Sequence, residues 1–253
     1  MVTVVSIVFG ALIGSFLNVC ISRLPKEESI VTPGSHCPQC KRPIKFYDNI
    51  PLVSYLLLRG KCRNCGNPIS TQYPLVESIT ALMSFLLFMK FGPSLSYLLY
   101  FAFVAGLIVI TVIDLYHQII PDVMSLPGIV VGLLGSLVIP QVTFLNSIIG
   151  VAVGGGSLFV VATLYQWVFK REGMGGGDVK LLAMIGAFLG WKAVILTILL
   201  SSLIGSITGI GIMVMKGKGF KYAIPFGPFL SLGAVIALFY GEALIQWYLG
   251  LNR

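Results

Sequence analysis

The chain has 253 residues, of which 57% are hydrophobic and only 10% are charged, and its mean hydropathy is +0.95. A composition this apolar excludes a wholly water-soluble protein and indicates one that lies mostly within a lipid bilayer. The net charge of +8 comes from basic residues that lie between apolar runs rather than in one stripe. Membrane topology therefore explains this charge better than nucleic-acid binding does.

The first apolar run, 2–22, is followed by Arg23 and Lys26 and has no positive charges before it, the reverse of the charge order of a secretory signal. We therefore expect a retained membrane helix there. About 20 apolar residues are needed for each span, and this criterion predicts eight helices in all. The shortest, 179–190, merges with the next, so six or seven spans remain an alternative. The eight helices are expected at residues 2–22, 74–91, 95–113, 123–139, 145–169, 179–190, 192–215 and 224–249.

The segment 23–73 is the only sizeable water-exposed piece, and it is rich in Pro, Gly, Cys and basic residues. A segment of this size usually needs a metal or disulfides in order to fold. Its four cysteines have the spacing C-x2-C-x21-C-x2-C, which lets two knuckles hold one zinc ion tetrahedrally. His36, beside the first knuckle, is expected to be a bystander. We predict a closed, structural zinc site made by Cys37, Cys40, Cys62 and Cys65.

Lysine and arginine decide the expected orientation, because cytoplasmic loops hold an excess of them. With eight spans, 14 basic residues fall on one side and three on the other. This division predicts that both termini lie outside and that the cysteine segment faces the reducing cytoplasm, where zinc is favoured over disulfides. The 14 lie in 23–73, 170–180 and 216–221, and the three are Lys90, Lys192 and Arg253.

Small residues recur at helical spacing in the apolar runs, and we expect them to form helix-packing surfaces. The pairs are Gly10 with Gly14, Gly128 with Gly132, Gly150 with Gly154 and Gly205 with Gly209.

Two of the nine acidic residues, Asp114 and Asp178, sit at the ends of apolar runs, where an unpaired carboxylate is costly. The topology predicts both at the same cytoplasmic depth. Two adjacent carboxylates are expected to share a proton near neutral pH, and such a pair can activate water for hydrolysis without a metal. The glycines at 175–177 are expected to let the backbone bend and approach a substrate strand closely.

Local roles are the alternative for these two aspartates. Asp178 could pair with Lys180 or cap a helix, and Asp114 could pair with His117. These roles leave the shared depth of the pair unexplained. A phosphate-binding loop is a further alternative for the glycine run, but the spacing does not fit G-x4-G-K-[ST].

Two other carboxylates have expected roles at helix starts. Asp122 follows Pro121 and is expected to be a helix N-cap rather than a partner in the site. Glu77 lies near a helix start, where it either stabilises the helix dipole or faces the site. Two other classes of protein remain alternatives to an enzyme for the whole chain. One is a proton- or cation-coupled transporter, and the other is a binding-only assembly protein of a pilus or secretion machine.

At these residues the chain resembles the type IV prepilin peptidases, also called leader peptidase/N-methyltransferases, over nearly its whole length. Asp178 matches the Gly-x-Gly-Asp signature that these enzymes share with presenilins, and Asp114 matches its partner. The matching segments are Gly10–Pro25, Cys37–Cys40, Tyr47–Leu52, Arg59–Cys65, Tyr73–Glu77, Asp114-Leu115, Ile120–Asp122, Gly175–Leu182 and Pro225–Leu230.

The resemblance implies a bacterial inner-membrane enzyme whose aspartate pair cleaves the short basic leader of type IV prepilins and of type II secretion pseudopilins. Members that carry the four-cysteine segment are similar to N-methyltransferases, which modify the new N-terminal residue with S-adenosylmethionine. The residues that would bind this cofactor are not identified by any glycine fingerprint.

The expected fold is therefore an all-α polytopic membrane protein with about eight transmembrane helices and a small zinc-binding cytoplasmic insert between the first and second. Its domains are expected at 1–22, the first helix; 23–73, the zinc-binding and methyltransferase part; and 74–253, the aspartyl peptidase domain. The expected partners are the lipid bilayer and the pilin substrates, with no nucleic acid.

Overall fold

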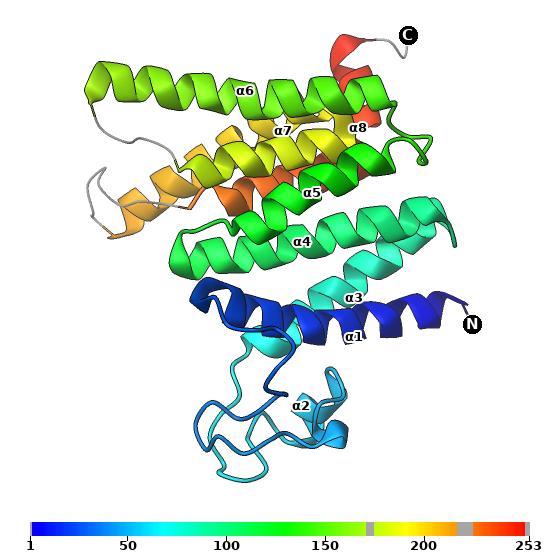
Figure 1. Cartoon of the computed structure of the whole chain (residues 1–253), viewed down its shortest axis with the longest axis vertical. Helices are drawn as coiled ribbons and strands as arrows, with labels where there is room; N and C mark the ends of the chain where they lie inside the picture. Colours follow the sequence, from blue (N-terminus) through cyan, green and yellow to red (C-terminus); the bar gives the residue numbers. More distant parts are fainter. Residues whose placement is uncertain (1, 171–174, 217–224, 251–253) are drawn as a thin grey trace. The chain divides into compact units, whose positions relative to one another are not determined.

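The computed structural model describes residues 2–170, 175–216 and 225–250, and the regular elements among these residues are helices, with no strand (Figure 1). Two isolated antiparallel bridges, both in the cysteine segment, are the only β-type pairings within that part of the chain. The predicted all-α fold is confirmed. Four of the basic residues used for the topology, Arg171, Lys218, Lys221 and Arg253, lie outside the described residues.

Six of the described helices are long and apolar enough to cross a membrane. The protein is therefore a multi-pass membrane protein, as predicted. Two 3-10 turns, η1 (Leu24–Lys26) and η2 (Phe46–Asp48), and the short helix α2 lie between α1 and α3. The α-helices in chain order are α1 (Val2–Arg23), α2 (Val53–Leu57), α3 (Gln72–Phe91), α4 (Leu95–His117), α5 (Asp122–Gly135), α6 (Phe144–Phe169), α7 (Gly176–Lys216) and α8 (Gly227–Leu249).

The long helix α7 is broken at Gly190, whose backbone has φ 76° and ψ 173°. Only glycine adopts this conformation readily, so the break divides α7 into two consecutive helices, 176–189 and 191–216. The two predicted helices 179–190 and 192–215 correspond to these halves. The first half and α5 have 14 residues each, or about 21 Å, which is shorter than a hydrocarbon core of about 30 Å.

The chain divides into two compact units, 1–109 and 110–253. In the first unit α1 packs closely on α3, because small residues face each other. A methyl group on Gly10 would lie 2.6 Å from Ser84 Cβ, and one on Gly14 would lie 2.7 Å from Glu77 Cα. Ser84 also donates a 2.7 Å hydrogen bond to the carbonyl of Ser6 across this contact. The predicted packing role of Gly10 and Gly14 is confirmed.

In the second unit α7 is the central helix, and α5, α6 and α8 pack against it (Figure 1). A methyl group on Gly150 would clash with the backbone of Gly186, and one on Gly132 would lie 2.7 Å from Ala187 Cβ. The glycines on α5 and α6 therefore bring these helices into backbone contact with the first half of α7, as expected of small-residue packing in membranes. This packing holds the first half of α7, which carries Asp178.

Candidate active site and metal centre

Asp114 lies in the last turn of α4 and is buried, with 5% of its surface exposed. Its Oδ2 atom accepts a 3.0 Å hydrogen bond from the backbone N–H of Gly227, the first residue of α8. A methyl group at position 227 would lie 2.6 Å from this oxygen, so the contact requires glycine. The carboxylate is thus held between two helices that are distant in sequence.

Asp178 is the third residue of α7 and is partly exposed. An acidic residue in the first turn interacts favourably with the helix dipole. Gly177, which precedes Asp178, and Gly227, which holds the Asp114 carboxylate, both lie against Ile120. The structure thus brings together the two aspartates that the sequence analysis singled out.

Ile120 joins the two sides of this site. A methyl group on Gly177 would lie 2.8 Å from Ile120 Cβ, and one on Gly227 would lie 3.4 Å from Ile120 Cδ1. The side chain of Ile120 therefore fills the space between the start of α7 and the start of α8. Ile120 and Gly227 belong to segments that carry the family resemblance, but no spacing in the sequence pointed to their contact.

The glycines before Asp178 behave differently from one another. Among the described residues, a methyl group on Gly176 would meet nothing within 4 Å, whereas one on Gly177 would meet Ile120. Neither Gly176 nor Gly177 has a positive φ. At Gly177 the missing side chain therefore allows a close approach to Ile120.

Asp122 is the first residue of α5, and Pro121 occupies the N-cap position, so the predicted N-cap role of Asp122 is wrong. Its carboxylate instead accepts hydrogen bonds of 2.7 and 2.8 Å from Lys180 Nζ, which joins α5 to α7. Lys180 is thus paired with Asp122 rather than with Asp178. The ion pair is exposed and contributes about 0–1 kcal/mol.

Glu77 forms a contact that the sequence analysis did not predict. It is buried in α3, and its Oε2 atom accepts a 2.8 Å hydrogen bond from the backbone N–H of Leu52 in the cysteine segment. Leu52 lies 25 residues earlier in the chain, which is why the sequence alone left the role of Glu77 open.

The four cysteines form a compact cluster in which all four sulfur atoms lie within 4.8 Å of one another. Cys37 Sγ and Cys65 Sγ are 3.9 Å apart. Tetrahedral zinc with Zn–S distances of about 2.3 Å requires sulfur atoms about 3.8 Å apart, so the arrangement fits a structural zinc site. The backbone N–H groups of Cys65 and Asn64 lower the pKa of the Cys62 thiol to about 7, which favours the thiolate that zinc binds.

The two knuckles repeat one another residue by residue. Cys37 N–H donates to Arg42 O at 3.0 Å, and Cys62 N–H donates to Asn67 O at 2.8 Å. After each second cysteine the chain takes a positive φ, of 57° at Lys41 and 73° at Gly66. Each knuckle therefore presents both of its sulfurs from the same tight turn.

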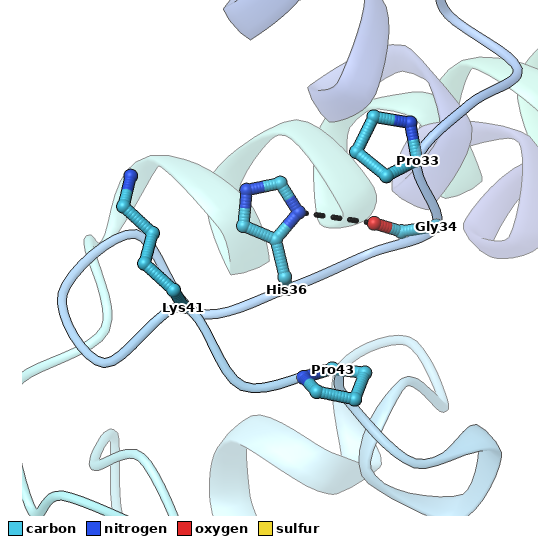
Figure 2. Close-up of a pocket in the computed structure, with 5 residues that line it drawn as sticks. All are labelled: Pro33, Gly34, His36, Lys41 and Pro43. Atoms are coloured by element: carbon cyan, nitrogen blue, oxygen red, sulfur yellow. Dashed lines mark hydrogen bonds between the residues drawn. The ribbon is translucent and has the colours of Figure 1, made fainter.

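His36 lies outside the sulfur cluster, as predicted. Figure 2 shows its ring and the Lys41 side chain beside a shallow hollow of about 330 Å³ between Pro33 and Pro43. The ring Nδ1 forms a 3.0 Å hydrogen bond with the carbonyl oxygen of Gly34. This hydrogen bond accounts for one of the two ring nitrogens.

These features define a helical membrane protein with a buried and a partly exposed aspartate in one compact unit and a four-thiolate centre in the other. Residues 8–91 match the Bacterial Peptidase A24 N-terminal domain, and residues 101–210 match the Type IV leader peptidase family. The chain belongs to the Type IV leader peptidase family.

Individual relatives cover most of the chain. A protein named prepilin leader peptidase/N-methyltransferase from Aeromonas hydrophila is 40% identical over 95% of this chain and 91% of its own length. A protein of the same name from Pseudomonas aeruginosa is 39% identical over 96% of this chain and 92% of its own length. A third protein of this name, from Myxococcus xanthus, is 40% identical over 83% of this chain and 63% of its own length. Comparison with solved structures found no match.

Proposed function

We propose that this protein is a membrane aspartic endopeptidase that removes the leader of type IV prepilins, with Asp114 and Asp178 as its catalytic residues. The observation that supports the proposal is that Ile120 lies against both Gly227, which holds the Asp114 carboxylate, and Gly177, which precedes Asp178. The name that the relatives share supplies the substrate class.

The proposed reaction is hydrolysis of one peptide bond. One carboxylate of the pair takes a proton from water, whose oxygen attacks the carbonyl carbon of that bond. The other, protonated carboxyl donates a hydrogen bond to the carbonyl oxygen; the C–N bond then breaks, and the leaving amine takes up a proton. No described atom would lie within 4 Å of a methyl group on Gly176, and we propose that an extended substrate segment passes there.

The proposed location is the bacterial inner membrane, with both termini outside and the aspartates at the cytoplasmic face. Support comes from the distribution of 14 basic residues against three in the eight-span arrangement. The pseudopilins of type II secretion are proposed as further substrates, since the family resemblance covers both.

A second activity, N-methylation of the new N-terminal residue with S-adenosylmethionine, is proposed from the shared name of the relatives. Zinc held by Cys37, Cys40, Cys62 and Cys65 would keep the cysteine segment folded, and its four filled positions leave no site for catalysis by the metal.

Purified single variants test the peptidase proposal. Asp114→Asn and Asp178→Asn should each lower prepilin cleavage by at least about a hundredfold, because general acid–base catalysis contributes that much or more. The matched control is Asp122→Asn, which removes a nearby exposed carboxylate and should leave cleavage unchanged. Full cleavage by either of the first two variants would refute the proposal and favour the transporter alternative.

Methyl transfer needs a separate assay with labelled S-adenosylmethionine and an already cleaved pilin. The label should pass to the pilin with the wild type and with Asp178→Asn alike, since the dyad is not required after cleavage. Absence of transfer with the wild type would remove the second activity without affecting the first.

A further inference from the structure

The cysteine segment has a short helix whose polar side faces inward and whose apolar side faces outward. In α2 the only buried residue is Ser54, whereas Leu56 and Leu57 are 73% and 77% exposed. Phe46 in η2 is 86% exposed. A segment surrounded by water buries its apolar side chains and exposes its polar ones. The reversed arrangement here indicates that another surface covers these apolar side chains.

The inward position of Ser54 is fixed by hydrogen bonds. Its hydroxyl donates to the carbonyl of Tyr47 at 2.9 Å and accepts from the N–H of Ile50 at 3.0 Å. These bonds hold α2 against η2 and leave the apolar side chains pointing outward. We call the exposed set Phe46, Val53, Leu56 and Leu57 the α2 face.

The depth of the α2 face follows from its attachment to α3. This helix has 20 residues, or about 30 Å, which matches the hydrocarbon thickness of a bilayer. Glu77 lies five residues from its start, about 8 Å along the axis. Because Glu77 holds the N–H of Leu52, and α2 begins at the next residue, α2 starts beside the first turns of α3, about 8 Å from the end of that helix. This is within the depth of about 5–10 Å at which the apolar side chains of interfacial segments lie.

The attachment is rigid on both sides. Leu52 has φ 61° and ψ −48°, and Val53 N–H donates to Pro51 O at 2.6 Å, which is a strained γ-turn with positive φ. At the other end of the segment the buried Arg23 donates to the carbonyls of Ser29 and Pro33. The segment is thus fixed to the ends of α1 and α3.

Basic side chains border the α2 face. Lys45, Arg59 and Lys61 are exposed, and Lys45 Nζ lies 5.6 Å from the ring centre of Tyr47. Arg63 is instead paired with Asp48, whose pKa it holds below the usual range. Segment 23–73 has eight basic and three acidic residues and stays basic even beside a zinc–tetrathiolate centre. This charge complements anionic lipid headgroups.

We propose that the α2 face docks on the bilayer, with its apolar side chains among the lipid headgroups and Lys45 and Arg59 against anionic phospholipid. The partner is thus the lipid surface itself rather than a protein. Apolar side chains at such an interface, with cations around them, are typical of segments that lie on a membrane. The proposal does not depend on the peptidase or methyltransferase activity.

A reporter at Leu57 tests the proposal in the full-length protein. Leu57→Trp is made in a background with Trp167, Trp191 and Trp247 replaced by Phe, and single copies are placed in nanodiscs. With brominated acyl chains the indole should lose about half of its fluorescence, because such side chains lie about 5–10 Å into the interface. Phe46→Trp is a second reporter, and Asn67→Trp, on the exposed second knuckle, is the matched control.

Lipid charge gives the second measurement. Quenching of the Leu57→Trp indole should be stronger in discs that contain phosphatidylglycerol than in discs of phosphatidylcholine alone. Lys45→Gln and Arg59→Gln should each lower the docked-to-undocked ratio about fivefold at low salt. Zinc content equal to that of the wild type shows that each variant is folded.

Three results would overturn the proposal. The first is quenching of Leu57→Trp and Phe46→Trp no greater than that of Asn67→Trp. The second is quenching of Leu57→Trp that is the same with and without phosphatidylglycerol and is unchanged by Lys45→Gln and by Arg59→Gln. The third is burial of the indole only in discs with two copies, which would make a second copy of the chain the occupant of the α2 face.

Discussion

At the scale of single residues, Gly176 and Gly177 differ in how close they lie to the side chain of Ile120. A methyl group on Gly177 would lie 2.8 Å from Ile120 Cβ, whereas one on Gly176 would have no described atom within 4 Å. An added methyl at 177 must therefore displace Ile120 from its place between the starts of α7 and α8.

We predict that Gly177→Ala lowers prepilin cleavage by about tenfold or more, because a small displacement of catalytic groups has a large effect on rate. Gly176→Ala should retain most of the activity. The measurement is the cleavage rate of each purified variant at equal amounts of folded protein. Equal loss in both variants would mean that the glycine run, rather than the contact with Ile120, determines activity.

The repeated knuckles give a second residue-scale prediction. Lys41 has φ 57°, where a side chain is strained, and Gly66 occupies the equivalent position. Lys41→Gly should stabilise the segment by about 1 kcal/mol, and Gly66→Ala should destabilise it by a similar amount. Thermal unfolding of the zinc-loaded protein, together with zinc retention under a chelator, would detect both changes. Opposite signs would contradict this account of the turns.

The carboxylates and thiols of the two candidate sites could be identified from the sequence. The apolar residues and glycines that contact them could not. Asp114, Asp178 and the cysteines stand out because a buried carboxylate and a paired thiol need an explanation wherever they occur. Ile120 and Gly227 are an ordinary apolar residue and one of 29 glycines. Their role arises from contacts between segments far apart in the chain.

At the scale of helices and turns, Glu77 connects the membrane helix α3 to the strained turn at Leu52. Removal of one partner from a buried hydrogen bond to a charged group costs about 1–3 kcal/mol. The turn is therefore expected to depend on this carboxylate.

We predict that Glu77→Ala increases hydrogen exchange at the Leu52 amide and protease cleavage of the segment 44–61, with the aspartate unit unaffected. Glu77→Gln is the matched variant, because its amide oxygen still accepts the hydrogen bond. Hydrogen exchange by mass spectrometry distinguishes them. Unchanged exchange in Glu77→Ala would show that the turn is held by other contacts.

The positions of the helices followed from the lengths of the apolar runs, but two features of α5 and α7 did not. The residue count placed a break near Gly190, and the structure shows that a glycine-specific backbone conformation makes it. The prediction that residues 123–139 form a full span did not anticipate that α5 ends at Gly135. Hydropathy cannot distinguish a short helix packed on others from a spanning one, since both are apolar.

At the scale of the whole molecule, the division at 109/110 places the four-thiolate centre and the two aspartates in different compact units. Metal removal should therefore act on the first unit. We predict that a chelator at mildly acidic pH, where thiolates take up protons, releases about one zinc per chain and opens residues 24–71 to protease.

The helices of the second unit should remain protected in the same digest. Cys37→Ser/Cys40→Ser should reproduce the effect without a chelator. Metal content and the pattern of protease fragments check both statements. Equal and negligible metal in the wild type and in the variant would refute the zinc assignment.

The central claim is that Asp114 and Asp178 act as one catalytic unit, and a double-mutant comparison tests it most directly. The measurement is the rate of prepilin cleavage by Asp114→Asn, by Asp178→Asn and by the variant with both changes. Residues that act as a unit show strongly non-additive losses, so the double variant should cleave no more slowly than the slower single variant. Losses that multiply in the double variant would show that the two carboxylates act independently and would contradict the proposed dyad.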